Sequence, residues 1–222
     1  MSEPGRLFVV AVPIGHPKDI TLRAIEVLQS VAAVICEEYR EGSTLLAKLG
    51  IQNELMVVNE HNEESESARI VELLAQGKSL ALISDCGTPV FADPGHFLLR
   101  TVVQAGLSVV PIPGPSSLTA ALSVCDFPLE QFVFGGFLPR EKDRRRRELE
   151  RLRGMRLPVI LMDTPYRMVA LLKEVAQVFG NKQQVMLACD LTLPSERIYR
   201  GEIQAVLKQI EKQKSEFVLI IR

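Results

Sequence analysis

The amino-acid sequence predicts an α/β protein of two domains, with a mostly parallel sheet in the N-terminal half and a mixed sheet in the C-terminal half. Three observations lead to this prediction. Short apolar, β-branched runs alternate with amphipathic segments through the first half, which is typical of βαβ units. In the second half, several strand-like runs follow one another with little helix between them. A proline-rich joint, PIPGPSS at 111–117, separates the halves.

Five nearly continuous apolar runs are predicted to form the N-terminal sheet. Strands covered on both faces lack the polar alternation of half-exposed strands. These runs lie at 7–12, 32–36, 55–59, 79–84 and 107–112. Amphipathic spacing predicts helices over 19–30 and 65–77, and Gly77 fits the C-cap of the second one.

The second half is predicted to begin with a helix of small residues at 117–124. Its further helices are expected near 165–179 and 203–213. Its strands are expected at 131–137, 157–163, 184–190, 196–202 and 216–222. Since the prolines of the joint fix φ and stiffen the chain, we place the domain boundary there, giving domains 1–113 and 114–222.

Composition and cysteine usage restrict the class of protein. At 47% hydrophobic and 24% charged residues, the chain is an ordinary globular protein. No apolar run approaches the ~18 residues of a membrane helix, and the N-terminus lacks signal-peptide features, so we expect a cytoplasmic protein without membrane contact. The cysteines are far apart and no CxxC pair occurs, so neither a metal site nor a disulfide framework is expected. They are Cys36, Cys86, Cys125 and Cys189.

The charge is concentrated in one segment. From Arg140 to Arg156 nine Lys or Arg residues face four acids, which makes the segment +5 in a chain of net charge −1. Local basicity favours phosphate contact. The alternative is a solvated helix, in which Glu141 pairs with Arg145 and an apolar side is formed by Leu149 and Leu152.

Four strand ends carry stretches rich in Gly, Pro, Ser or Thr. They read VPIGHPKDIT (12–21), SDCGTPVFADPG (84–95), PIPGPSS (111–117) and MDTPYR (162–167). In open α/β sheets ligands bind outside the carboxyl ends of the strands, so these stretches predict a ligand site. None matches GxGxxG or GxxxxGK[ST], which argues against a common dinucleotide or P-loop site.

Together with HNEE (61–64) and FVFGGFLPR (132–140), these stretches resemble the tetrapyrrole methylase superfamily. Within it they resemble the branch that methylates a ribose 2′-oxygen of a cytidine in small-subunit ribosomal RNA. The resemblance runs from about residue 6 to 222. It implies a homodimeric S-adenosylmethionine-dependent methyltransferase with a tetrapyrrole-methylase-like fold and the cofactor in a cleft between its domains. The alternatives are a corrin- or porphyrin-type acceptor, or a non-catalytic relative that binds cofactor or RNA.

The resemblance also implies a set of cofactor-binding residues. Asp85 would accept hydrogen bonds from the cofactor's amine or hydroxyls, Gly87 would let backbone approach it, and Thr88 would contact the methionine part. Asp93 is expected to cap a helix that starts at Pro94. The whole set is Pro13, Asp85, Gly87, Thr88, Ser116, Ser117, Met162 and Leu193.

Acid–base candidates lie in two places. Glu37 and Glu38 directly follow a predicted strand, and Arg40 is expected to pair with them or to bind phosphate. His61 would assist deprotonation or orient an acceptor oxygen; the alternative is an ordinary surface histidine. Glu63 would orient His61 or cap the next helix.

The remaining expected contacts are to the acceptor. Arg167 is expected to contact the acceptor because of the resemblance. Four consecutive arginines are expected to do so because their number exceeds what surface ion pairing requires. These four are Arg144, Arg145, Arg146 and Arg147. Relatives carry His and Thr where this chain has Glu41 and Gly42, so the departures from the family lie where the substrate is expected.

Overall fold

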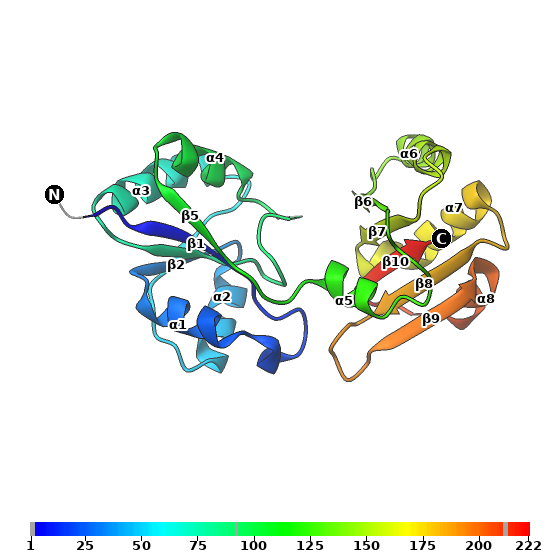
Figure 1. Ribbon diagram of the computed structural model, residues 1–222, viewed down its shortest axis with the longest axis horizontal. Coiled ribbons are helices and arrows are strands. Elements are labelled where there is room, and N and C mark those ends of the chain that lie inside the picture. The colour runs from blue at the N-terminus through cyan, green and yellow to red at the C-terminus, as the bar shows by residue number, and fades with distance from the viewer. Residues whose placement is uncertain (1–2, 92, 211–212) are drawn as a thin grey trace. The chain divides into compact units, whose positions relative to one another are not determined.

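The structure, a computed structural model, describes residues 3–91, 93–210 and 213–222. The chain divides into two compact units, Met1–Ser116 and Ser117–Arg222. The predicted boundary lies three residues earlier, at 113/114. Figure 1 shows one sheet with its helices in each unit, and the two are described separately below.

The sheet of the first unit has the strand order β3-β2-β4-β1-β5, and every pair of neighbours is parallel. This confirms the predicted parallel sheet. The central strands β2, β4 and β1 bring the loops after β1 and β4, and the residues after β2, to the same edge. The strands are β1 (Arg6–Val10), β2 (Ala33–Cys36), β3 (Leu55–Val57), β4 (Leu80–Leu82) and β5 (Ser108–Ile112).

Two helices cover each face of this sheet (Figure 1). On one face the buried Leu28 and Leu46 come from α1 and α2. On the other face Ile70 and Leu98 come from α3 and α4. The helices are α1 (Leu22–Ser30), α2 (Tyr39–Lys48), α3 (Glu63–Ala75) and α4 (His96–Gln104), and a 3-10 turn, η1 (Pro17–Asp19), precedes α1.

Two helix assignments differ from expectation. Helix α2 was not predicted, because it buries only Gly42 and Leu46 and holds Gly and Ser, which are weak helix formers. Helix α4 begins at His96 and not at Pro94, and its N-cap is Gly95 at φ 128°, so the prediction that Asp93 caps it was wrong.

The sheet of the second unit has the order β6-β7-β10-β8-β9. The β6–β7 pair is parallel and the other pairs are antiparallel, which confirms the predicted mixed sheet. The strands are β6 (Val133–Phe137), β7 (Val159–Asp163), β8 (Gln184–Cys189), β9 (Arg197–Glu202) and β10 (Phe217–Ile221).

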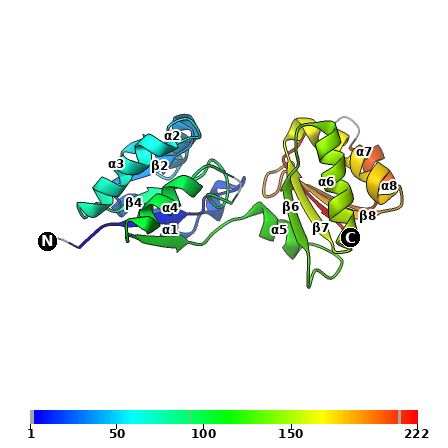
Figure 2. The ribbon, with the colours of Figure 1, turned by 90° about the horizontal axis from the view of Figure 1, so that it is seen from above.

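Helices α6, α7 and α8 share one buried cluster with this sheet, and α5 contributes Ala121 to a cluster that includes Ile160. Figure 2 shows α6 beside β6 and β7. The prediction of a helix to residue 213 extends beyond α8, and residues 211–212 lie outside the described chain. The helices are α5 (Ser117–Ser123), α6 (Lys142–Gly154), α7 (Met168–Phe179) and α8 (Ile203–Gln209), and a 3-10 turn, η2 (Pro165–Arg167), precedes α7.

Candidate active site

The loop after β4 is held in place by its own polar groups. The Ser84 hydroxyl donates to the carbonyl oxygens of Cys86 at 3.1 Å and Gly87 at 3.3 Å. The Val12 N–H donates to the Gly87 carbonyl at 2.8 Å, which ties this loop to the end of β1. The Thr88 hydroxyl donates to the Pro115 carbonyl at 3.0 Å, which ties it to the segment after β5.

The same loop contains two unusual backbone conformations. Gly87 has φ 77°, and a Cβ there would lie 3.2 Å from Cγ2 of Ile14, so only glycine fits without displacement. Val90 has φ 69° and is buried, although a β-branched residue rarely adopts this conformation. Such strain persists only where the surroundings determine the backbone, and it is frequent at ligand sites.

The predicted cofactor residues of the first unit therefore gather at one edge of its sheet. Pro13 follows β1, Asp85 and Thr88 follow β4, and Ser116 follows β5, while β4, β1 and β5 are neighbours in the sheet. Ser117, Met162 and Leu193 belong to the second unit: Ser117 begins α5, Met162 lies in β7, and Leu193 lies in the turn between β8 and β9. The Leu193 side chain is partly exposed.

Carboxylates converge beside this loop because β2 and β4 are neighbours. The backbone N–H of Glu38 donates to the Asp85 carboxylate. Burial raises the pKa of Glu37, and the charges of Asp85 and Asp93 raise it further. Burial also raises the pKa values of Asp85 and Asp93. Since the charges that act on these groups belong to other carboxylates, the edge of the sheet carries a negative field suited to a cationic ligand.

Close packing brings the start of α2 to the same edge. A Cβ at Gly42 would lie 2.8 Å from Sγ of Cys36, so α2 approaches β2 as closely as glycine permits. Burial, then the charges of Asp85 and Glu38, raises the pKa of the Cys36 thiol to about 11, which keeps it protonated at neutral pH. Gly42 thereby positions Glu41 on the exposed side of α2.

A hollow of about 220 Å³ lies between α2 and the loops after β1 and β4. We call it the α2 hollow. Two predicted cofactor residues, Pro13 and Asp85, are part of its lining, so it adjoins the loop site. Its lining is Val12, Pro13, Ile14, Gly15, Pro17, Glu41, Thr44, Leu45, Lys48, Ser84, Asp85 and Cys86.

The predicted acid–base residues differ in how close they lie to the loop site. Arg40 is exposed and, within the described chain, forms no ion pair with Glu37 or Glu38. The His61 side chain is 83% exposed, with Nε2 3.6 Å from Oε1 of Glu60. Glu63 is the first residue of α3, and within the described chain its side chain makes no hydrogen bond to His61 and does not cap α3.

The role of Glu63 lies instead at the start of α4. Its Oε1 accepts a hydrogen bond at 3.0 Å from the backbone N–H of Leu98, in the first turn of that helix. This N–H has no partner within its own helix, since the first turn of every helix leaves its donors free. A carboxylate from α3 thus supplies the cap that Asp93 was predicted to supply.

Helix α6 divides the four arginines into two kinds. The Arg145 guanidinium is nearly buried and donates to Glu174 on α7 through Nε at 2.5 Å and Nη2 at 2.6 Å. Its Nη1 donates to the carbonyls of Pro139 and Arg140. The prediction that Arg145 contacts the acceptor is therefore wrong, because its donors are occupied inside the protein.

The other three arginines are exposed. Arg144 pairs with Glu141 at 3.0 Å, and Arg146 pairs with Glu150 at 3.1 Å, each on the same helix. Arg147 forms no ion pair within the part of the chain that the structure describes. Exposed ion pairs of this kind contribute little free energy, so all three arginines remain able to bind a phosphate.

Arg167 is also engaged within the second unit. Its Nη2 lies 3.2 Å from Oδ2 of Asp163, whose side chain is 1% exposed, and it donates to the carbonyls of Leu138 and Pro139. The contact to Asp163 lacks hydrogen-bond alignment, so Oδ2 has no hydrogen-bond partner in the described chain. Arg167 therefore fastens the end of β7 to the segment after β6, although a quarter of its side chain is exposed.

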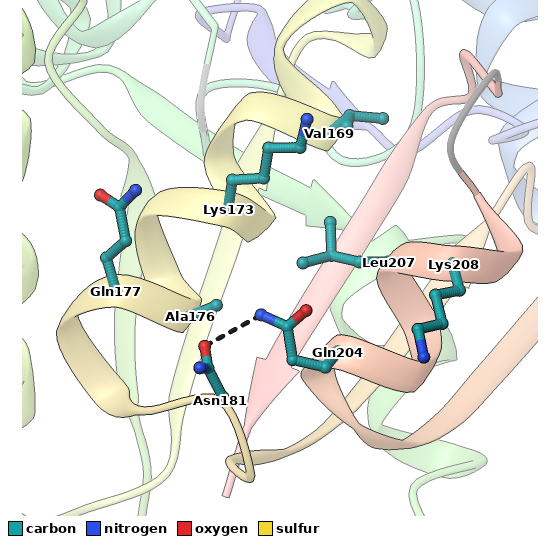
Figure 3. Close-up of a pocket in the computed structure, with 8 residues that line it drawn as sticks. All are labelled: Val169, Lys173, Ala176, Gln177, Asn181, Gln204, Leu207 and Lys208. Atoms are coloured by element: carbon teal, nitrogen blue, oxygen red, sulfur yellow. Dashed lines mark hydrogen bonds between the residues drawn. The ribbon is translucent and has the colours of Figure 1, made fainter.

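A second hollow, of about 360 Å³, lies between α7 and α8 (Figure 3). Two of the residues that line it are joined, since Gln204 Nε2 donates to Asn181 Oδ1 at 2.9 Å. None of the predicted site residues lines it. Its lining is Val169, Lys173, Ala176, Gln177, Asn181, Gln204, Leu207 and Lys208.

Two further properties concern the whole described chain. Over residues 3–91, 93–210 and 213–222, no three His, Cys, Asp or Glu side chains are grouped so that they could hold a metal ion. Within the same ranges, no helix has the length and apolar character needed to span a bilayer.

Sequence comparison relates the whole chain to known proteins. The family profile described as Tetrapyrrole (Corrin/Porphyrin) Methylases matches residues 6–207. A protein of Xylella fastidiosa (strain Temecula1) named Ribosomal RNA small subunit methyltransferase I is 38% identical over 100% of this chain and 83% of its own length. A protein of the same name from Escherichia coli O157:H7 is 38% identical over 99% of this chain and 78% of its own length.

Structural comparison gives the same fold. A diphthine synthase superposes with a TM-score of 0.75 at 18% identity, covering 97% of this chain and 88% of its own. A uroporphyrin-III C-methyltransferase from Thermus thermophilus, complexed with S-adenyl homocysteine, superposes with a TM-score of 0.67 at 17% identity, covering 98% and 97%. The family profile and the named relatives thus define a methyltransferase, and the superpositions show that this chain shares the fold. This chain belongs to the tetrapyrrole (corrin/porphyrin) methylase family.

Proposed function

We propose that this protein transfers the methyl group of S-adenosylmethionine to a ribose 2′-oxygen of small-subunit ribosomal RNA. The observation that carries the proposal is the 38% identity, over 99% or more of the chain, to relatives named for that RNA. The choice of the 2′-oxygen rests on the resemblance of the loop motifs. We further propose that the protein is homodimeric, again on the resemblance, and that it is cytoplasmic, on its widely spaced cysteines.

The charge of the loop site supports this cofactor. S-adenosylmethionine carries a sulfonium and an ammonium group, and the convergent carboxylates raise one another's pKa values in the absence of such a cation. In the first unit Pro13, Asp85, Gly87, Thr88 and Ser116 would hold it. The Thr88 hydroxyl proton is already donated to Pro115, so Thr88 would offer its backbone amide or its hydroxyl lone pairs.

The second unit is proposed to contribute Ser117, Met162 and Leu193 to the cofactor set. This part of the proposal rests on the resemblance of their surrounding motifs. When bound, the cofactor supplies an activated methyl group, so no metal is required to generate the electrophile. The chain's own residues have to position the acceptor and remove its proton.

Proton removal is assigned to Glu37. A ribose hydroxyl is a weak acid, so a carboxylate whose pKa is raised toward neutrality is a better general base than an ordinary one. Burial and the neighbouring carboxylates raise the pKa of Glu37 in this direction. Glu37 would accept the hydroxyl proton while the sulfonium–methyl bond breaks and the methyl group passes to the oxygen, with the demethylated thioether as leaving group. Glu38, Arg40 and His61 remain proposed participants without an assigned step.

RNA contact is assigned to the exposed face of α6. Arg144, Arg146 and Arg147 present guanidinium groups to solvent, and each can bind a phosphate oxygen pair. The carboxylate-rich edge of the first unit's sheet disfavours phosphate. The backbone of the RNA is therefore held by α6, and an uncharged part of the acceptor enters the carboxylate site.

The test uses purified protein, tritiated S-adenosylmethionine and small ribosomal subunits from cells that lack this protein. We expect one labelled nucleotide, and mass spectrometry should locate the added mass on its ribose. Subunits from cells that contain the protein are the control and should accept no label. Label in neither substrate, with turnover of a porphyrin-type acceptor, would replace the RNA proposal.

A further inference from the structure

Helix α2 presents a second face to the α2 hollow, away from the core. The residues that line the hollow are Glu41, Thr44, Leu45 and Lys48, at the spacing i, i+3, i+4 and i+7 of one helical stripe. The core side of α2 is formed instead by Gly42 and Leu46, which are buried. Three of the four residues in the stripe are polar and exposed, so they can offer hydrogen bonds to a ligand in the hollow.

The polar groups of this stripe have a fixed order. Glu41 accepts hydrogen bonds when ionised, Thr44 can donate its hydroxyl proton, and Lys48 only donates. From Glu41 to Lys48 the stripe therefore offers an acceptor, a donor and a second donor over about 10 Å of helix. Opposite it, the Asp85 carboxylate acts on the same space, since the charge of Glu41 contributes to the raised pKa of Asp85.

Part of the remaining lining of the hollow is apolar. Pro13, Ile14 and Pro17 come from the segment after β1, and Leu45 comes from α2. Aliphatic and proline surfaces of this kind can cover the face of a planar ring. The volume of about 220 Å³ is enough for one base.

We infer that the α2 hollow binds one unpaired nucleobase of the RNA acceptor and that Glu41 selects a base whose exocyclic amino group faces it. The inference rests on the proposed function. Enzymes that act on one nucleotide take it out of the stack and read its Watson–Crick edge with hydrogen bonds. The edge of cytosine offers a donor, an acceptor and an acceptor, which complements Glu41, Thr44 and Lys48. Uracil has a carbonyl oxygen in place of that amino group, so an acceptor would face the Glu41 carboxylate.

The charge of Glu41 gives this contact its selectivity. An ionised carboxylate only accepts hydrogen bonds, so Glu41 discriminates against a base with a carbonyl oxygen at that position. Glu41 is thus a specificity-determining residue, and its contact is with the base and not with the transferred methyl group.

The experiment is an NMR titration of the isotope-labelled full chain with the phosphate-free nucleosides cytidine and uridine. We expect cytidine to shift the amide signals of Thr44, Lys48 and Cys86, and to bind roughly tenfold more tightly than uridine. Glu41→Ala should reduce this preference to less than about twofold, and Glu41→Lys should reverse it, since a cation donates to a carbonyl oxygen. Glu72→Ala, an exposed glutamate on α3, is the matched control and should leave the preference intact.

The outcomes separate this inference from the proposed function. Shifts confined to other parts of the chain, or a preference that survives Glu41→Ala, overturn the base pocket while methylation of ribosomal subunits still stands. The same holds if neither nucleoside produces shifts at saturating concentration. Absence of methyl transfer to ribosomal subunits overturns the proposed function and is read independently of the titration. Calorimetry with S-adenosylmethionine checks that each Glu41 variant keeps its cofactor site.

Discussion

Arg145 on α6 and Glu174 on α7 form a two-pronged ion pair, with Nε to Oε2 at 2.5 Å and Nη2 to Oε1 at 2.6 Å. Their side chains are 11% and 16% exposed. The third nitrogen of the same guanidinium holds the carbonyls of Pro139 and Arg140. One arginine of the basic run therefore joins two helices and the segment that leads into α6.

Removing Glu174 should destabilise the protein. Loss of one partner leaves the other charge nearly buried and unpaired, so we expect Glu174→Ala to lower the free energy of unfolding by about 2–4 kcal/mol. Urea denaturation measures the change. The control is Glu150→Ala, which breaks the exposed pair with Arg146 and should cost less than about 1 kcal/mol. Equal losses in the two variants would show that the α6–α7 pair is no more than a surface contact.

The same pair should make stability depend on acid pH. The hydrogen bond from Arg145 lowers the pKa of Glu174 below its ordinary value. The folded state therefore binds the proton later than the unfolded state as the pH falls. The contribution is complete above the ordinary glutamate pKa and is lost as the pH falls through the lowered pKa. Glu174→Gln should flatten the stability–pH curve in this acid range, and an unchanged slope between pH 5 and 3 would contradict the assignment.

Asp85 should act in the opposite sense. Burial, then the Glu41 and Glu38 charges, keeps its pKa raised against the Glu38 N–H bond, so its ionised form disfavours the folded state above that pKa. Asp85→Asn keeps an acceptor for the Glu38 N–H but removes the charge. We expect a higher melting temperature at neutral pH and a roughly ten- to hundredfold loss of S-adenosylmethionine affinity by calorimetry. A variant that melts earlier and binds normally would make Asp85 a structural residue.

Glu37 should control the pH dependence of methyl transfer. A base acts only when ionised, and burial raises the pKa of Glu37 above its ordinary value. The kcat/KM of the wild type should therefore rise with pH through this raised pKa and then level off. Glu37→Gln should lower kcat by about 10²–10⁴-fold and remove that rise. Glu72→Gln, at an exposed glutamate of α3, serves as control. An identical pH profile in Glu37→Gln would transfer the role to another group.

The exposed arginines should govern the salt dependence of RNA binding. Each neutralised phosphate contributes a slope of roughly −0.7 to −0.9 to the dependence of log affinity on log salt. Changing Arg146 and Arg147 to Gln should flatten the slope by about one to two units and leave cofactor affinity unchanged. A double variant at Arg69 and Arg100, exposed on the first unit, is the control. If the two double variants have the same slope, α6 is only a solvated helix.

Much of the fold could be predicted because a buried strand appears in the sequence as a continuous apolar run. The strands of the parallel sheet are covered on both faces, so runs such as 79–84 are continuously apolar, and that property needs no knowledge of the partner strands. Helix α2 has no comparable apolar pattern. Its core side consists of Gly42 and Leu46, and its polar stripe resembles a loop in sequence.

The site shows the same division. Glycine, proline and hydroxyl side chains at strand ends predicted where a ligand binds, because backbone conformation at those residues is decided locally. Strand order brought Glu37 beside Asp85, since β2 and β4 are neighbours in space although β3 lies between them in the chain. The raised pKa of Glu37 is a property of that neighbourhood, and no single segment carries it.

Arg145 shows most clearly what could not be predicted from the sequence. It stands among three other arginines, and only its spacing of four and seven residues from Leu149 and Leu152 indicates that it faces inward. Its partner Glu174 lies on another helix, 29 residues further along the chain. The sequence by itself determined the elements, the loops and the concentration of positive charge. Only tertiary packing decided which of these charges meet inside the protein, because that depends on which helix faces which.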